Sequence, residues 1–305
     1  MRDDNALETR SGGRIPRETI AARLAEVGYV ADRDLATALW MMDYLRRPLL
    51  IEGEAGVGKT EVAKALAAVY GSELIRMQCY EGLDASSALY EWNYQRQLLA
   101  IKAREGSGAS ASEVEAQIFS EPYLLERPLL AAIRRKVPPV LLVDEVDRAD
   151  EEFEAFLLEL LSDFQVTIPE FGVIAALSIP RVVLTSNATR ELSDALRRRC
   201  LYHYLDFPDV DREAAILLNR QPSLDANFAM QIARMVGMLR KEDLKKVPGV
   251  AETLDWAATL AGLEIEDLRD EPEIVHATLI ALLKTREDRA AISPETTSRL
   301  VGRVA

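Results

Sequence analysis

The chain has 305 residues, of which 37 are Lys or Arg and 50 are Asp or Glu, so its formal net charge is −13. Hydrophobic residues make up 49% of the chain and charged residues 29%, which is enough apolar material for a packed core and argues against a disordered chain. The acidic balance disfavours a general nucleic-acid or anionic-membrane binder, because such proteins depend on clustered Lys and Arg. At about 150 residues per domain, two domains are expected.

The sequence also bears on the cellular compartment. No apolar run approaches the roughly 20 residues that a membrane-spanning helix needs, and the polar segment Met1–Asn5 is not expected to act as a secretory signal. Cys79 and Cys200 lie far apart, and His203 and His276 do not have the spacing of a metal site. We therefore expect a reduced, cytoplasmic protein without a transmembrane segment, and peripheral attachment to a membrane stays open.

Taken in chain order, the first two thirds of the sequence alternate helices with short apolar strands. After a loose arm over 1–14, helices are predicted over 16–47 with a break near 28, then over 61–70, 127–136, 153–164 and 192–198. Strands are predicted over 48–52, 73–78, 140–143, 181–185 and 201–207. Such alternation is typical of parallel βαβ units. The sequence therefore predicts an α/β fold, a parallel sheet of about five strands flanked by helices.

Two segments interrupt this pattern, and a third part follows it. An insertion is expected over about 83–119, with a flexible break at 107–112, and a hairpin over about 165–180. After Pro208 only helices are predicted, over 211–220, 224–241, 249–261 and 271–286. The expected organisation is an N-terminal arm and helix (1–28), an α/β domain (29–208) and a small all-helical domain (209–305).

A glycine-rich loop follows the first predicted strand. Residues 53–60 read GEAGVGKT, which matches G-x-x-x-x-G-K-T between a strand and a helix. Its backbone amides and the following helix N-terminus would hold phosphates, Lys59 would reach the β- and γ-phosphates, and the Thr60 hydroxyl would bind Mg²⁺. The candidate nucleotide-binding residues are Gly53, Glu54, Ala55, Gly56, Val57, Gly58, Lys59, Thr60 and Glu61. The alternative is a plain strand-to-helix turn with a surface lysine.

Polar residues end two of the predicted buried strands. Asp144 and Glu145 follow the strand 140–143, at an edge where open α/β sheets bind ligands. Asp144 suits the Mg²⁺ shell, and Glu145 suits a general base that activates water. Asn187 follows the strand 181–185 and would orient that water or touch the γ-phosphate, unless it only forms a turn.

Three arginines, Arg197 to Arg199, stand at the end of a short predicted helix. A nucleotide site built from the residues above lacks a cation for the charge that develops in the transition state. An arginine from a neighbouring subunit can supply that charge. The alternative is a solvated basic patch at a helix C-terminus.

These segments, in this order, resemble the Walker A, Walker B, sensor 1 and arginine-finger elements of AAA+ ATPases. The resemblance runs over 29–208, and the helical tail resembles the AAA+ lid. Residues 144–149 (DEVDRA), 157–159 (LLE) and 165–168 (QVTI) resemble the MoxR family. Residues 78–84 (QCYEGLD), 89–95 (LYEWNYQ) and 118–123 (IFSEPY) resemble its CoxD-like members, which are associated with maturation of the molybdenum–copper centre of CO dehydrogenase.

The resemblance implies a chaperone-like enzyme that hydrolyses ATP with Mg²⁺ and forms a homo-hexameric ring with a site at each subunit boundary. Arg199 matches the finger position best, with Arg197 second, and Tyr29 and Val30 match the segment near the adenine. The insertion and the hairpin would engage a client metalloenzyme. A protein with a von Willebrand A domain is the implied partner.

One departure from the family pattern is visible. Where many relatives carry a sensor 2 arginine in the lid, residues 248–253 read PGVAET, so no residue is assigned to that role. The alternatives are a remodelling ATPase for another enzyme (of the Rubisco-activase or nitric-oxide-reductase type), a non-hydrolysing nucleotide-gated scaffold, and a nucleic-acid motor. The negative net charge disfavours the motor, and no nucleic-acid partner is expected.

Overall fold

The computed structural model describes residues 15–104 and 110–304. The expected arm over 1–14 and residues 107–109 of the expected break lie outside this part. Contacts divide the chain into two compact units, one with residues up to 20, 34–52 and 66–203, the other with 21–33, 53–65 and 204–305. Each unit is described by itself.

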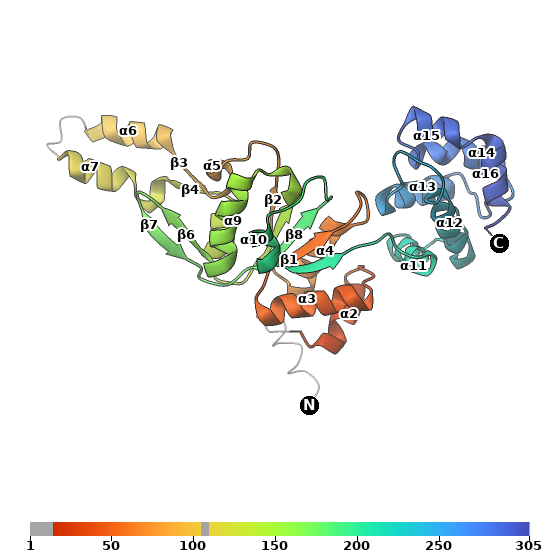
Figure 1. Ribbon diagram of the computed structural model, residues 1–305, viewed down its shortest axis with the longest axis horizontal. Coiled ribbons are helices and arrows are strands. Elements are labelled where there is room, and N and C mark those ends of the chain that lie inside the picture. The colour runs from red at the N-terminus through yellow and green to blue at the C-terminus, as the bar shows by residue number, and fades with distance from the viewer. Residues whose placement is uncertain (1–14, 105–109, 305) are drawn as a thin grey trace. The chain divides into compact units, whose positions relative to one another are not determined.

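The first unit is built on a five-stranded sheet with the order β2-β5-β8-β1-β9 (Figure 1). Its strands are β1 (Leu49–Glu52), β2 (Leu74–Gln78), β5 (Val140–Asp144), β8 (Arg181–Ser186) and β9 (Leu201–Tyr204). The pairs β1–β8, β5–β8 and β2–β5 are parallel. Every residue of β5 and β8 is buried, as expected of a parallel sheet covered on both faces. The predicted α/β class is confirmed, although β9 ends at Tyr204, earlier than the sequence suggested.

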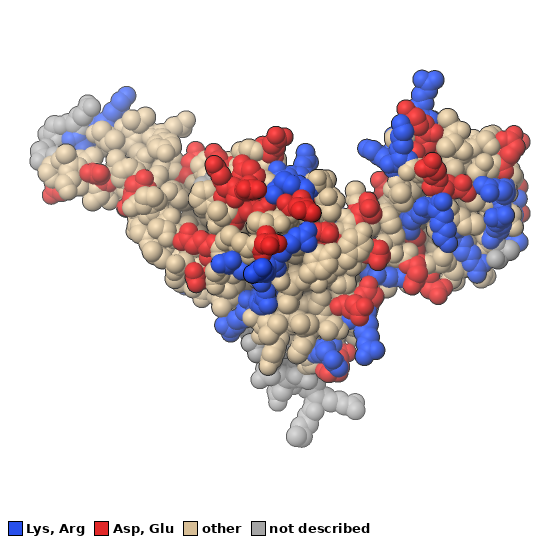
Figure 2. Space-filling model, viewed as in Figure 1, with Lys and Arg blue, Asp and Glu red and all other residues tan. Residues whose placement is uncertain are grey.

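Helices of the predicted amphipathic kind accompany the strands. They are α2 (Arg17–Glu26), α3 (Arg33–Leu45), α4 (Lys59–Tyr70), α8 (Pro128–Arg134), α9 (Glu151–Asp163) and α10 (Asp194–Arg199). Asp150 caps α9 by accepting a hydrogen bond from the Phe153 amide, and Phe153 is buried in the core. Phe156 has the helical spacing of the same apolar face, but it is 41% exposed because it lies at the margin of the buried stripe. Acidic side chains gather over α9, whose first turn alone carries three glutamates (Figure 2).

The insertion contains more structure than the sequence predicted. It holds α5 (Ala85–Ala88), β3 (Tyr90–Trp92), α6 (Tyr94–Arg104) and α7 (Ala111–Ile118). β3 pairs antiparallel with β4 (Leu124–Glu126), which follows the insertion, and the sequence analysis missed this pair. Ser110 caps α7, so the end of the expected break is ordered. β6 (Gln165–Ile168) and β7 (Gly172–Ala175) form a hairpin within the expected range. The Trp92 indole donates to the Glu170 carboxylate in the hairpin turn at 3.3 Å, which joins the two segments.

The C-terminal region of the second unit is helical, as predicted, around a core of its own. Its helices are α11 (Val210–Arg220), α12 (Ala226–Leu239), α13 (Val250–Gly262), α14 (Pro272–Thr278), α15 (Arg286–Ala291) and α16 (Pro294–Val301). The single helix predicted over 271–286 is wrong. α14 ends at Thr278 and a separate helix starts after Thr285, whose extended backbone and side chain cap α15. Within the described residues, no helix is long and apolar enough to cross a membrane.

Candidate active site

The predicted phosphate loop, residues 53–60, joins β1 to α4 and has a backbone that requires glycine. Gly56 and Gly58 have φ values of +85° and +97°, which side chains with a Cβ rarely adopt. A Cβ on Gly53 would lie 2.3 Å from the Leu205 carbonyl oxygen. The loop therefore approaches neighbouring backbone too closely for any other residue, as a loop that wraps a phosphate must.

Lys59 closes the loop from the inside. Its side chain is largely buried, and Nζ donates to the carbonyl oxygens of Gly53 at 2.7 Å and Glu54 at 2.8 Å. These hydrogen bonds offset the cost of burying the ammonium group. Lys59 is also the first residue of α4, so its charge and the helix N-terminus both serve the same loop. This arrangement fits an anion with several oxygens.

A turn before α13 contacts the phosphate loop within the second unit. The Val250 amide donates to the Gly56 carbonyl oxygen at 2.9 Å. A Cβ on Gly249 would lie 2.8 Å from both Cα and the carbonyl oxygen of Gly56, so the two glycines meet backbone to backbone. Glu252 accepts a hydrogen bond from the Gly249 amide at 3.1 Å and caps α13. This stretch, to which no sensor 2 residue was assigned, makes a main-chain contact with the phosphate loop.

A buried ion pair anchors that turn. Arg240 pairs with Glu213 through two hydrogen bonds of 2.6 and 2.7 Å, and both side chains are less than 10% exposed. The Arg240 Nε donates to the Pro248 carbonyl oxygen at 2.9 Å, and the Thr253 hydroxyl donates to Glu213 at 2.9 Å. Removing one partner would leave a buried charge uncompensated. Sequence reasoning missed this pair, because its members are 27 residues apart in the chain.

Tyr29 and Val30, which were expected near the base of the nucleotide, belong to the same compact unit as the phosphate loop. Arg212 of α11 donates to the Val30 carbonyl oxygen at 3.0 Å and pairs with Asp32 at 2.8 Å. Burial is the main reason why the pKa of Tyr29 rises to about 12, so the phenol stays neutral at physiological pH. Arg212 therefore fixes the backbone of this segment.

The acidic strand end, Asp144 and Glu145, lies in the first unit. The Thr185 hydroxyl donates to Asp144 Oδ1 at 2.6 Å and accepts a hydrogen bond from the Glu145 amide at 2.9 Å. Arg76 on β2 pairs with Asp144 Oδ2 at 2.6 Å. Asp144 is thus held by the strands on either side of β5. Sequence reasoning missed Thr185 and Arg76, because their role depends on strand order and register.

Glu145 has an unusual backbone for a side chain of its size. Its φ and ψ are 55° and 51°, in the left-handed region, directly after the buried strand. The carboxylate is about one-third exposed and pairs with Arg148 at 3.2 Å. A carboxylate that is reachable by solvent yet fixed at its backbone suits a residue that must meet a water molecule.

Asp147 connects the acidic strand end with Asn187, which follows β8. Its buried carboxylate accepts hydrogen bonds from the backbone N–H groups of Asn187 at 3.2 Å and Thr189 at 2.9 Å, and from the Thr189 hydroxyl at 2.6 Å. Burial alone would raise the pKa of Asp147, but these hydrogen bonds outweigh it and hold the pKa below its ordinary value. The structure thereby brings the predicted residue Asn187 beside the predicted carboxylates through a residue that was given no role.

The arginine triplet, Arg197 to Arg199, lies at the end of α10 with all three side chains exposed. Arg197 pairs with Glu52, the last residue of β1, at 3.4 Å. Arg199 donates to the Ser162 hydroxyl at 2.5 Å and to the Ala195 carbonyl oxygen at 3.3 Å. These contacts of Arg199 are with α9 and α10, not with the acidic strand end of its own chain.

The donor groups can be tested against Mg²⁺. Among the described residues, no group of three or more His, Cys, Asp or Glu side chains could hold a metal ion. Mg²⁺ does not need such a group, since it commonly takes one or two protein oxygens together with phosphate oxygens and water. The Thr60 hydroxyl and the Asp144 carboxylate are oxygen donors of this kind. Each of the two units therefore offers one oxygen donor of the kind that Mg²⁺ takes when a nucleotide carries it.

Comparison with known proteins gives a family match. The profile of the AAA domain (dynein-related subfamily) matches residues 48–200, half of the chain. Uncharacterized proteins of Staphylococcus haemolyticus and Staphylococcus aureus (strain bovine RF122 / ET3-1) are each 24% identical, over 81% of this chain and 89% of theirs. The Thermotoga maritima RuvB Holliday junction branch migration motor is 18% identical, with a TM-score of 0.42 over 89% of this chain and 72% of that chain. The matched residues hold the phosphate loop, the acidic strand end, Asn187 and the arginine triplet.

The lowered pKa of Asp147 predicts an acid-sensitive stability difference. A carboxyl whose pKa is lower in the folded state stabilises the fold above its unfolded pKa and loses this effect as the pH falls through its folded pKa. The free energy of unfolding of Asp147→Asn should therefore lie below that of the wild type at neutral pH. This gap should shrink as the pH falls below 3.8, the ordinary pKa of an aspartate. Urea unfolding at several pH values measures this gap. Asp163→Asn, an exposed change on α9, is the control, and a gap that is constant across pH would contradict the prediction.

The close approach of two glycines predicts a steric effect. Gly249 has a φ of −83°, so alanine would fit its backbone, but its Cβ would crowd both Gly56 and the Glu252 carboxylate that caps α13. Gly249→Ala should lower the free energy of unfolding by about 1–3 kcal/mol, as overpacking does. Gly262→Ala near the end of the same helix has open space and should be neutral or slightly stabilising. Equal thermal midpoints for the two variants in calorimetry would show that the contact is not made.

Proposed function

Because the chain belongs to the AAA domains of the dynein-related subfamily, we propose that it binds ATP with Mg²⁺ and hydrolyses it to ADP and phosphate. The proposal rests on two features, each observed within its own compact unit. One is a glycine-backed loop closed by a buried lysine, and the other is a strand end where Asp144 and Glu145 share the Thr185 hydroxyl. The first feature suits phosphate binding and the second suits the activation of water.

The chain's own residues would divide the work as follows. Backbone amides of residues 53–60 would bind the phosphates, and Lys59 would exchange its carbonyl partners for phosphate oxygens. Thr60 and Asp144 would hold Mg²⁺, which supplies charge neutralisation on the phosphate oxygens when it is bound. Glu145 would take the proton of the attacking water, and Asn187 would orient that water. Tyr29 and Val30 would lie near the adenine.

We propose that Arg199 acts on the site of a neighbouring subunit in a homo-hexameric ring, with Arg197 as the second candidate. Both arginines are exposed. Arg199 donates hydrogen bonds to Ser162 on α9 and Ala195 on α10, and not to Asp144 or Glu145 of its own chain. A guanidinium that arrives from outside stabilises the charge that spreads over the transferred phosphoryl group. The ring is what would bring each arginine to the next site.

The client is proposed to be a protein, in keeping with the MoxR-like pattern. The insertion exposes large apolar side chains on α6, namely Tyr94, Leu98 and Leu99, which are 58–68% exposed. The segments that resemble the CoxD-like members lie in or beside this insertion, which supports maturation of a metalloenzyme such as a molybdenum–copper CO dehydrogenase. A von Willebrand A domain protein is the proposed partner, and the protein is proposed to work in the cytoplasm.

The assignment of the base predicts the behaviour of Glu145→Gln. The amide cannot take a proton, so turnover should fall by about 10²–10⁴ while ATP binding stays, because the phosphate loop is untouched. Phosphate release and binding of a fluorescent ATP analogue measure the two effects. Glu151→Gln on the exposed start of α9 is the matched control and should keep turnover. Undiminished hydrolysis in the Glu145 variant would overturn the assignment.

The assignment of the finger predicts the behaviour of Arg199→Ala. Loss of a finger lowers turnover by about 10³-fold or more without removing the nucleotide site. Arg198→Ala, the exposed neighbour in the triplet, is the comparison, and Arg197→Ala tests the second candidate. Steady-state phosphate release at increasing protein concentration is the measurement, since a site completed by a neighbour gains activity as subunits associate. A wild-type rate in dilute monomer would rule out a shared site.

A further inference from the structure

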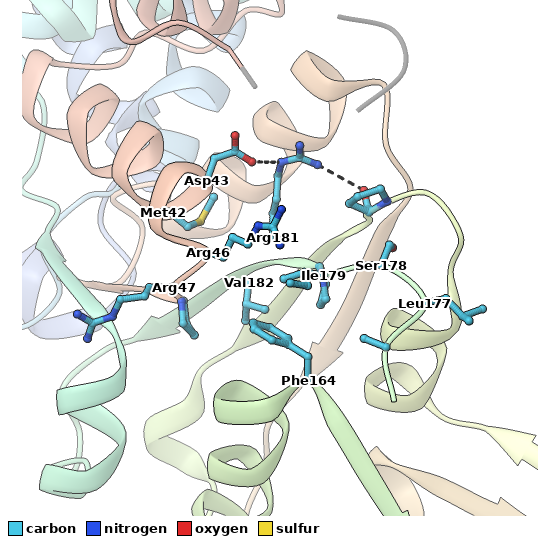
Figure 3. Close-up of a pocket in the computed structure, with 14 residues that line it drawn as sticks. Met42, Asp43, Arg46, Arg47, Phe164, Leu177, Ser178, Ile179, Arg181 and Val182 are labelled. Carbon is cyan, nitrogen blue, oxygen red and sulfur yellow. Dashed lines mark hydrogen bonds and ion pairs between the residues drawn. The ribbon is translucent and has the colours of Figure 1, made fainter. Parts of the chain in front are cut away.

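A cavity of about 360 Å³ lies at the starts of β1, β5 and β8, on the side of the sheet away from the acidic strand end. Two arginines that line it have different partners. Arg181 is buried and pairs with Asp43 at 2.7 Å, whereas Arg47 points away from that pair and the cavity (Figure 3). Arg47 lies two residues before the first residue of β1, so its backbone leads directly into the sheet.

The Arg47 guanidinium binds the main chain at the end of α10. Nη2 donates to the carbonyl oxygens of Arg198 at 2.6 Å and Cys200 at 3.3 Å, and Nε donates to that of Arg199 at 3.2 Å. The next residue is fixed by the same segment, since the Leu201 amide donates to the Pro48 carbonyl oxygen at 2.7 Å. Four consecutive residues, 198–201, are therefore bonded to Arg47 and Pro48.

Such a contact has a clear physical use. The last carbonyls of a helix have no partner within the helix, and α10 has only six residues, so it supplies little order of its own. A guanidinium presents several donors in one rigid plane and can serve three carbonyls together, which a lysine ammonium cannot do with the same geometry. The direction in which the triplet side chains leave the backbone follows from how these carbonyls are held.

We propose that Arg47 is a positioning residue that holds the main chain of the arginine triplet so that its side chains face outward in one orientation. This inference rests on the proposed function of the triplet as the source of the finger. Arg47 itself is directed to the backbone carbonyls of residues 198–200. Its role is to set the place from which the triplet acts.

Turnover and nucleotide affinity separate positioning from general damage. A misplacement of about 1 Å can cost about 10²-fold in rate, so Arg47→Ala should lower turnover by up to about that factor while the affinity for a fluorescent ATP analogue stays within about twofold. Arg47→Lys should recover part of the rate, because an ammonium group can serve some of the three carbonyls. Arg46→Ala is the matched control, since Arg46 is exposed and is not the residue that binds these carbonyls.

A thiol measurement tests the same inference without any catalysis. Cys200 is 7% exposed and lies in the held segment, and burial raises the pKa of its thiol to about 12. Arg47 works against that rise, so its removal alone would make the thiolate scarcer and labelling slower. Faster labelling of Cys200 in Arg47→Ala, by about tenfold or more, would therefore report opening of the segment. Mass spectrometry of the labelled peptide distinguishes Cys200 from Cys79.

The outcomes separate this inference from the proposed function. Slower turnover with unchanged affinity, together with faster labelling in Arg47→Ala but not in Arg46→Ala, supports the inference. If Arg199→Ala lowers turnover, but Arg47→Ala neither lowers turnover nor speeds the labelling of Cys200, the inference is wrong and the proposed function stands. If the wild type hydrolyses no ATP, the proposed function is wrong, and equal labelling rates in the two variants would overturn the positioning role as well.

Discussion

The parallel pairing of β5 with β8 is the interaction on which the chemistry of the first unit depends. Both strands are buried along their whole length, and their parallel register pairs Val143 with Leu184. This register places the Thr185 hydroxyl against Asp144 and the Glu145 amide. The loop after β8 then reaches Asp147, and Asn187 is fixed beside the same edge. The buried apolar strands thus hold the polar residues that follow them in fixed positions at one edge of the sheet.

Buried charge is used differently in the second unit. The side chains of Lys59 and Arg240 are both largely buried. Each of them donates hydrogen bonds to main-chain carbonyl oxygens. Lys59 holds the phosphate loop, and Arg240 with Glu213 holds the turn that contacts it. Water is excluded from both places, so each hydrogen bond counts for more than it would at the surface. The loop is therefore supported from within and from the helical region.

Much of this arrangement could be predicted from the sequence, and the limits have physical reasons. The strands of the main sheet were predictable, because buried parallel strands are short apolar runs. The phosphate loop was predictable, because Gly53 to Lys59 belong to one contiguous motif. The pair β3 and β4 was not, because three-residue strands carry almost no periodic signal. Thr185 and Asp147 escaped notice for another reason, since a hydroxyl within a strand and one more acidic residue among many acquire a role only through pairing. The prediction of one helix over 271–286 failed because the chain leaves the α-helix at Thr278 for a 3₁₀ turn, Leu279–Ala281, and starts a new helix only after Thr285.

The meeting of Gly56 and Gly249 has a consequence for how this protein can diverge from its relatives. Two main chains in direct contact leave no room for a β-carbon at either glycine, and Glu252 is the side chain that borders the junction. Selection would act there only on the absence of a β-carbon, a signature that charge-based pattern searches overlook. The phosphate loop and the turn before α13 are thus linked mechanically through peptide groups, without a guanidinium at this joint.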